Sequence, residues 1–103
     1  MGEFLVERYL PGISAHAVRE ARIRLQEVIE EMAWEGNELR YLHCTFLPDD
    51  ESVLCVFLGS STDVVMEANR RAAFAFDRVV PATEIDCDAG RTEEGPRDDG
   101  IVP

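Results

Sequence analysis

Two carboxylates and an imidazole occur in apolar segments of this 103-residue chain, far apart in the sequence. Glu7 lies in the first segment, His43 in a central one and Glu84 in the last. Such a set can bind a divalent cation or transfer a proton if the fold brings it together. The alternative involves no chemistry: a packed or hydrogen-bonded interior histidine, with the glutamates paired to Arg8 and Arg40 or lining a hydrated interface. The residues alone leave these interpretations open.

Other reactive groups point to no activity. The three cysteines lack paired C-x-x-C spacing, so we expect no structural zinc site, and we expect Cys44 and Cys55 to be buried reduced thiols. The sequence has no Gly-rich phosphate loop, nucleophile elbow or H-E-x-x-H motif. It also has no lysine, which excludes Schiff-base chemistry. We therefore assign no catalytic residue.

Composition restricts the partners. The net charge of −11, from 10 basic and 21 acidic residues, argues against a nucleic-acid partner. There is no apolar stretch of about 18 residues and no leader-like start, so we expect a cytoplasmic protein without a membrane partner. The use of arginine for every basic side chain is typical of a GC-rich bacterial genome.

The hydrophobic pattern predicts a fold. Strand-like runs cover 4–9, 39–47, 53–58 and 79–86, and helical stripes follow Ser14 and Thr62. The order strand, helix, strand, strand, helix, strand predicts an α+β, ferredoxin-like βαββαβ sandwich, with a four-stranded antiparallel sheet and two helices on one face. We expect residues 1–87 to form this domain. Residues 88–103, rich in Gly, Pro and acidic side chains, are expected to be a disordered acidic tail.

The central hairpin sets which side chains share a face. If Leu47 pairs with Ser52, the numbers of paired residues add up to 99, and Cys44 opposes Cys55 beneath the helices. The uncovered face then receives the following side chains from the four strands: Leu5, Glu7 and Tyr9; Tyr41, His43 and Thr45; Leu54, Val56 and Leu58; Ala82, Glu84 and Asp86. A slip of one residue would reverse the faces.

The uncovered face predicts a partner. In the usual strand order the first and last strands are neighbours, so Glu7 and Glu84 are expected close together, with His43 roughly 10 Å from Glu7. The apolar patch between them is too large for a small monomer to expose. We expect a homodimer through this face, which would bring the edge strands of two subunits together.

The ordered set of segments 6–12, 41–44, 55–57, 65–68 and 77–79 resembles a family of small bacterial proteins, domain of unknown function 4242. Its V-E-R-x-x-P-G opening, strand histidine and D-R-V step are similar to residues 6–12, His43 and 77–79 here. The characterised type of that family is a nickel-binding protein with a dimeric ferredoxin-like α+β barrel. One departure is that the family tends to have Glu-His where this chain has Glu67-Ala68.

The resemblance implies a non-catalytic protein that binds nickel or another divalent transition metal, with His43, Glu7 and Glu84 as ligands. One alternative is a small-molecule-binding module or enzyme that uses the cavity of the dimeric barrel, lined by Tyr9, Tyr41, Thr45 and Val56. The other is a purely structural or partner-binding dimer.

Overall fold

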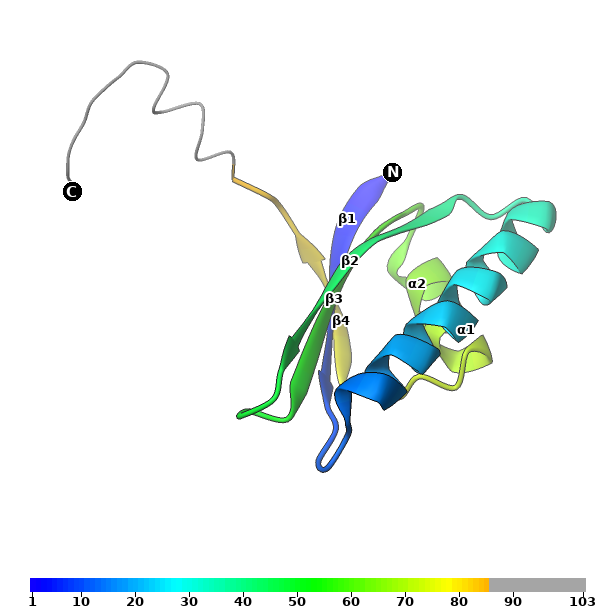
Figure 1. The fold of residues 1–103 in the computed structure, drawn as a ribbon. Helices are drawn as coiled ribbons and strands as arrows, with labels where there is room; N and C mark the ends of the chain where they lie inside the picture. Colours follow the sequence, from blue (N-terminus) through cyan, green and yellow to red (C-terminus); the bar gives the residue numbers. More distant parts are fainter. Residues whose placement is uncertain (86–103) are drawn as a thin grey trace, which may run out of the picture.

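The structure is a computed structural model that describes residues 1–85. Its elements are β1 (Gly2–Tyr9), α1 (Ala15–Trp34), β2 (Leu39–Leu47), β3 (Ser52–Gly59), α2 (Thr62–Arg71) and β4 (Arg78–Ala82). The strands form one antiparallel sheet in the order β2-β3-β1-β4. Both helices lie on the same face of that sheet, and the other face is left uncovered (Figure 1). The predicted ferredoxin-like α+β fold is confirmed. The predicted tail, and Asp86 with it, lies outside the described residues.

Local sequence signals explain where α1 begins and ends. The Ser14 Oγ accepts a hydrogen bond from the Ala17 N–H at 3.0 Å, which caps the first turn. At the other end Gly36 has a φ of +94°, a left-handed conformation that favours glycine. The Asn37 N–H donates to the Met32 carbonyl at 3.0 Å, so a Schellman motif ends the helix as the Gly-Asn sequence predicts.

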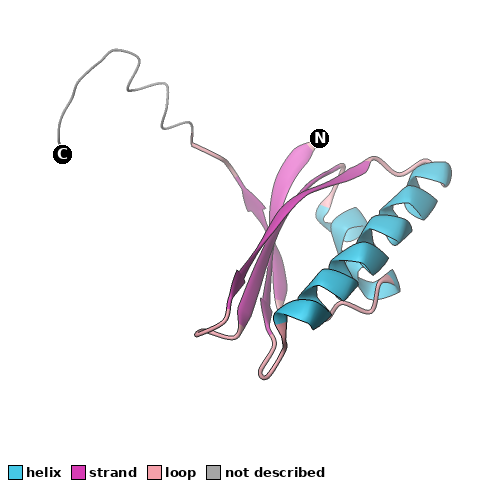
Figure 2. Cartoon of the chain, viewed as in Figure 1, coloured by secondary structure: helices cyan, strands magenta, loops and turns pink. Residues whose placement is uncertain are grey.

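The core lies between the helices and the covered face of the sheet (Figure 2). Helix α1 buries the stripe predicted from its spacing, and the strands supply alternate side chains. The buried apolar residues of the core are Phe4, Val6, Val18, Ala21, Leu25, Ile29, Met32, Leu39, Val53, Cys55, Phe57, Val65, Ala68, Ala72 and Phe74. Among residues 1–85, neither helix is long and apolar enough to cross a bilayer.

The predicted register of the central hairpin is right only up to His43. From Leu47 to His43 each residue opposes the expected partner, and Cys44 faces Cys55. A β-bulge then lies between Tyr41 and His43, and Tyr41 opposes Phe57, whereas paired numbers that add up to 99 would place Leu42 opposite Phe57. The extra residue of the bulge shifts the pairing by one, so the β2 residues before it point to the opposite face from the one predicted. The placement of Tyr41 on the uncovered face is therefore wrong.

The last strand is shorter than predicted. It ends at Ala82, whereas the pattern indicated a strand through Asp86. As expected for a strand that contains Pro81, β4 is an edge strand and pairs only with β1. Glu84 follows the strand and is exposed.

Candidate functional site

The uncovered face is an array of three rows that run across the sheet. Read in the order β2, β3, β1, β4, they are Arg40, Leu58, Glu3, Ala82; His43, Val56, Leu5, Val80; and Thr45, Leu54, Glu7, Arg78. The middle of the array is apolar, and the ionisable groups lie toward its edges and corners. We call this array the open face.

His43 is the imidazole of the open face. It lies on the edge strand β2, in the row of Val56, and is exposed. Its imidazole makes no hydrogen bond or ion pair with any residue of the described part, 1–85. The alternative of a packed interior histidine is wrong. His43 is available to a ligand that approaches this face.

Glu7 is on the open face as predicted, but it already has a cationic partner. Both of its carboxylate oxygens accept hydrogen bonds from Arg78, at 3.0 Å from Nε and 2.9 Å from Nη2. The two residues are direct cross-strand neighbours on β1 and β4, and the hydrogen bonds that Arg78 donates to Glu7 raise the pKa of Arg78. The sequence interpretation that gave Glu7 to Arg8 or Arg40 is therefore wrong. A metal would have to compete with a bidentate guanidinium for Glu7.

Glu84 does not lie beside Glu7. Because Glu7 opposes Arg78, Glu84 follows six residues further along the chain, up to roughly 20 Å away if that segment is extended. The expected proximity of the two carboxylates is wrong because β1 and β4 pair in a register that leaves Glu84 beyond the sheet. Within residues 1–85 no three His, Cys, Asp or Glu side chains are placed to hold one metal ion. Residues 1–85 of one subunit therefore offer no group of three such side chains that could hold a nickel ion.

Three of the predicted cavity residues, Tyr9, Thr45 and Val56, belong to the open-face side of the sheet. Val56 is central and half-buried, while Tyr9 is 58% exposed beyond the last row. Tyr41 instead lies beneath the helices, where its ring stacks on Phe57 with centroids 5.1 Å apart. Burial raises the pKa of Tyr41.

Position 68, where the resembling family has a histidine, is on the other side of the sheet from His43. Ala68 is fully buried between α2 and the covered face. A side chain at this position cannot share a metal with His43 inside one subunit. The neighbouring Asn69 is also fully buried and is bonded to Arg8, so it is not free to replace a ligand.

Arg8 is the residue that sequence reasoning missed. It is only 1% exposed and lies in the core with no carboxylate partner among residues 1–85. Its guanidinium donates to neutral acceptors: Asn69 Oδ1 at 2.7 Å, Phe74 O at 3.0 Å, Ala75 O at 3.3 Å and Cys55 Sγ at 3.4 Å. It also lies 3.5 Å from the centroid of the Phe74 ring. Its Nε has no acceptor within residues 1–85, and desolvation by burial lowers the pKa of Arg8 to about 10.

The signal for this burial was present in the alternation of β1. Phe4 and Val6 point into the core, and Arg8 is the next residue of the same phase. The residue type indicates the opposite, because arginine is almost never fully buried. The guanidinium ties the end of α2 to the segment that leads into β4.

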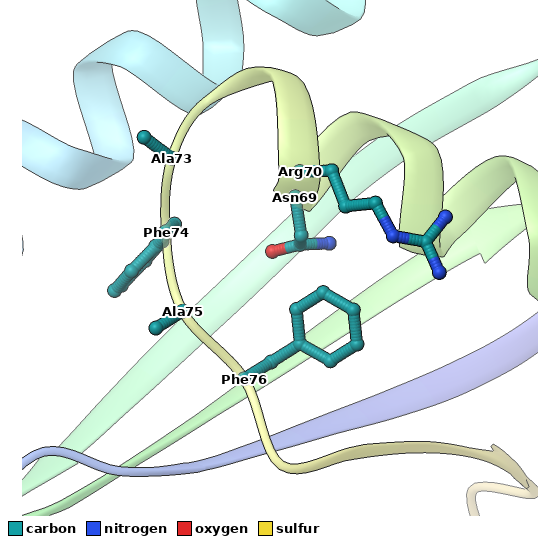
Figure 3. Close-up of a pocket in the computed structure, with 6 residues that line it drawn as sticks. All are labelled: Asn69, Arg70, Ala73, Phe74, Ala75 and Phe76. Atoms are coloured by element: carbon teal, nitrogen blue, oxygen red, sulfur yellow. The ribbon is translucent and has the colours of Figure 1, made fainter.

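A pocket of about 360 Å³ opens beside this tie. It is lined by Asn69, Arg70, Ala73, Phe74, Ala75 and Phe76. In Figure 3 the Asn69 amide lies at the end of α2, and the Phe76 ring lies near the Arg70 side chain. The backbone carbonyls of this wall are already used by Arg8. We therefore assign no ligand to it.

The two cysteines of the central hairpin differ from our expectation. They oppose each other as predicted, with Cα atoms 4.2 Å apart, but they form a disulfide rather than remaining as thiols. The pairing followed from the register. The covalent bond could not be inferred from the composition, which gave no reason to expect an oxidising environment.

These features define a class: a small ferredoxin-like α+β protein with one face of its sheet uncovered. The chain belongs to the family described as nickel responsive protein SCO4226-like, whose model matches residues 4–81. A solved structure titled "Crystal structure analysis of SCO4226 from Streptomyces coelicolor A3(2)" has the same fold, with a TM-score of 0.70 and 15% identity over 82% of this chain and 99% of that one. No curated protein matches. The nickel-related family is thus confirmed, while the domain of unknown function 4242 remains a resemblance.

Proposed function

We propose that this protein is a non-catalytic, nickel-type metal-binding homodimer whose metal site is completed only between two subunits. The observation that carries the proposal is His43, an exposed imidazole without a partner in residues 1–85, at the edge of a sheet face that no helix covers. The family description, which names a nickel-responsive protein, supports the choice of metal. Imidazole with carboxylate oxygens is a ligand set that nickel accepts.

The composition of the open face favours a second copy as its partner. Its centre is apolar, with Leu5, Leu54 and Val56 in adjacent positions. Its charged side chains are Arg40 and Arg78, at two of the corners, and Glu3 and Glu7, on β1, so the face is neutral in a chain of net charge −11. Two copies can therefore meet here without the like-charge repulsion expected elsewhere on the surface.

Face-to-face packing of two subunits could also supply the further metal ligands that His43 lacks within its own subunit. His43 lies on one edge strand, and Glu84 follows the opposite edge strand. In a symmetric dimer each β2 edge approaches the partner's β4 edge, which would bring His43 toward Glu84 of the partner subunit. Glu7 would contribute only if Arg78 released it.

Metal titration tests the site. The chain has two histidines, so His43→Ala and His16→Ala form a matched pair. His16 is in the first turn of α1, exposed and 3.2 Å from Glu20, far from the open face in structure and role. We expect nickel heats by calorimetry to be lost in His43→Ala and kept in His16→Ala. Equal heats from both variants, or none from the wild type, would retire the metal site.

Sedimentation tests the dimer independently. Val56→Asp puts a carboxylate in the centre of the open face, where pairing would bury it without a partner. Ile23→Asp is the control, because Ile23 is 51% exposed on α1 and lies on the helix side. We expect the wild type and Ile23→Asp to sediment as dimers and Val56→Asp as a monomer. A wild-type monomer at micromolar concentration would overturn this arrangement.

A further inference from the structure

The buried guanidinium of Arg8 lacks an anionic partner, and the nearest group that can become an anion is Cys55. Arg8 is 1% exposed, Cys55 is fully buried, and Arg8 Nη2 lies 3.4 Å from Cys55 Sγ. The Tyr41 hydroxyl is 3.8 Å from the same sulfur. While Cys55 is in a disulfide, Arg8 has only neutral acceptors among residues 1–85. A Cys55 thiolate would give the cation its counter-charge.

The other sulfur of the pair can be reached from outside. Cys44 is half-buried and lines a pocket of about 200 Å³ between α1 and β2, together with Ala15, Val18, Arg19, Arg22 and Phe46. This pocket is on the helix side of the sheet. The proposed dimer through the open face would leave it accessible. A reagent that enters the pocket would therefore meet Cys44 before Cys55.

The rim of this pocket is positively charged. Arg19 and Arg22 are exposed, and neither forms an ion pair with another residue in the described part of the chain. The floor, by contrast, is apolar, with Val18 and Phe46. Two cations above an apolar floor suit a small organic anion in a protein whose surface otherwise repels anions.

We propose that Cys44 and Cys55 form a thiol–disulfide exchange site for a small thiol that carries a carboxylate. The incoming thiolate attacks Cys44 Sγ and forms a mixed disulfide there. The bond between the cysteines breaks, and its electron pair stays on Cys55 Sγ as a thiolate beside the Arg8 cation. A second thiolate of the same kind attacks the small-molecule sulfur of the mixed disulfide. The products are the disulfide of the small thiol and a reduced Cys44–Cys55 pair, so two electrons pass from two thiols to the protein.

The sites of the two sulfurs are tested by trapping. The protein should carry Cys87→Ser, so that only Cys44 and Cys55 can react. Before the reaction, its intact mass should be lower than that of the reduced protein by two hydrogen atoms. After brief reaction with 3-mercaptopropionate and acid quenching, cleavage at Glu51 separates the two cysteines for mass spectrometry. We expect the adduct on Cys44 and a free thiol at Cys55. An adduct on Cys55, or two free thiols in protein isolated in air, would overturn the proposal.

The pocket's selectivity is tested by comparing thiols. We expect 3-mercaptopropionate to reduce the pair roughly threefold to tenfold faster than neutral 2-mercaptoethanol, after correction for thiolate fraction, because two exposed cations attract the carboxylate. Arg22→Gln should lower this ratio. Arg70→Gln removes the same charge from an exposed side chain of α2 that does not line this pocket, and it should leave the ratio unchanged. If the two variants changed the ratio equally, the preference would come from the overall charge of the protein, and the proposed role of the pocket rim would be overturned.

The thiolate partner of Arg8 has its own measurement. Cys44→Ser and Cys55→Ser, each in the Cys87→Ser background, leave one thiol apiece. We expect the ultraviolet absorbance of a thiolate at neutral pH from Cys55 alone and not from Cys44 alone, since only Cys55 lies beside the guanidinium. The opposite pattern, or a protonated thiol in both variants, would contradict the assignment.

Discussion

Asn69→Ala should destabilise the fold far more than the loss of an ordinary asparagine side chain, because Asn69 is the closest acceptor of the buried Arg8 cation. Its Oδ1 accepts from Arg8 at 2.7 Å, and the residue is fully buried. A hydrogen bond to a charged group contributes about 1.5–3 kcal/mol, and its loss leaves a guanidinium N–H unpaired in the core. The small cavity adds to this, so we expect the free energy of unfolding to fall by about 2–4 kcal/mol.

Asn37→Ala is the matched control, since the chain has two asparagines. The Asn37 amide is half-buried and donates only a long bond, 3.3 Å, to the Met32 carbonyl. Its loss should cost no more than about 1 kcal/mol. Urea denaturation followed by circular dichroism gives both free energies of unfolding. In a separate thermal scan, the Asn69→Ala variant should melt roughly 10–20 °C below the wild type.

A double-mutant cycle decides whether the loss comes through Arg8. In an Arg8→Met background there is no cation to leave unpaired, so Asn69→Ala should cost about 1.5–3 kcal/mol less than in the wild type. A coupling energy below about 0.5 kcal/mol, or equal losses in Asn69→Ala and Asn37→Ala, would refute the reasoning.

Two further predictions concern the ends of α1. Ser14→Ala removes the N-cap acceptor and should lower the free energy of unfolding by about 1 kcal/mol, whereas Ser60→Ala, a serine with no capping role, should change it by less than about 0.5 kcal/mol in the same urea assay. The hydrogen bond from Arg71 lowers the pKa of Glu35, so this pair stabilises the fold above the ordinary Glu pKa of 4.5, and the contribution is lost as the pH falls through the lowered pKa. The difference in urea midpoint between wild type and Glu35→Gln should therefore shrink as the pH falls from neutral through and below 4.5, and a constant difference would contradict the assignment.

The sequence predicted the element order because each element carries its own local signal. The stripe of α1, the Ser14 cap and Gly36 are read within a few residues of one another. The bulge near Leu42 has no such signal, since no glycine marks it and both possible phases of β2 place apolar side chains inward. That single position decided whether Tyr41 faced the open side or the core.

The site was harder to predict because it depends on pairings between distant strands. Whether Glu84 lies beside Glu7 is set by the β1–β4 register, which no local pattern fixes. The Glu7–Arg78 pair follows from the same register. Arg8 could have been placed in the core from alternation alone, but its neutral acceptors come from a turn after α2 that the sequence does not reveal.

The bulge in β2 also bears on how this protein can aggregate. A regular, flat edge strand is a template for an added strand from another molecule, which leads to continuous intermolecular sheets. Here β2, one edge, is interrupted between Tyr41 and His43, and β4, the other edge, is five residues long and contains Pro81. Both are features that natural sheets use to discourage edge-to-edge pairing. Growth by strand addition is therefore disfavoured at both edges of the sheet, so the face-to-face homodimer that we propose would not compete with pairing at the edges.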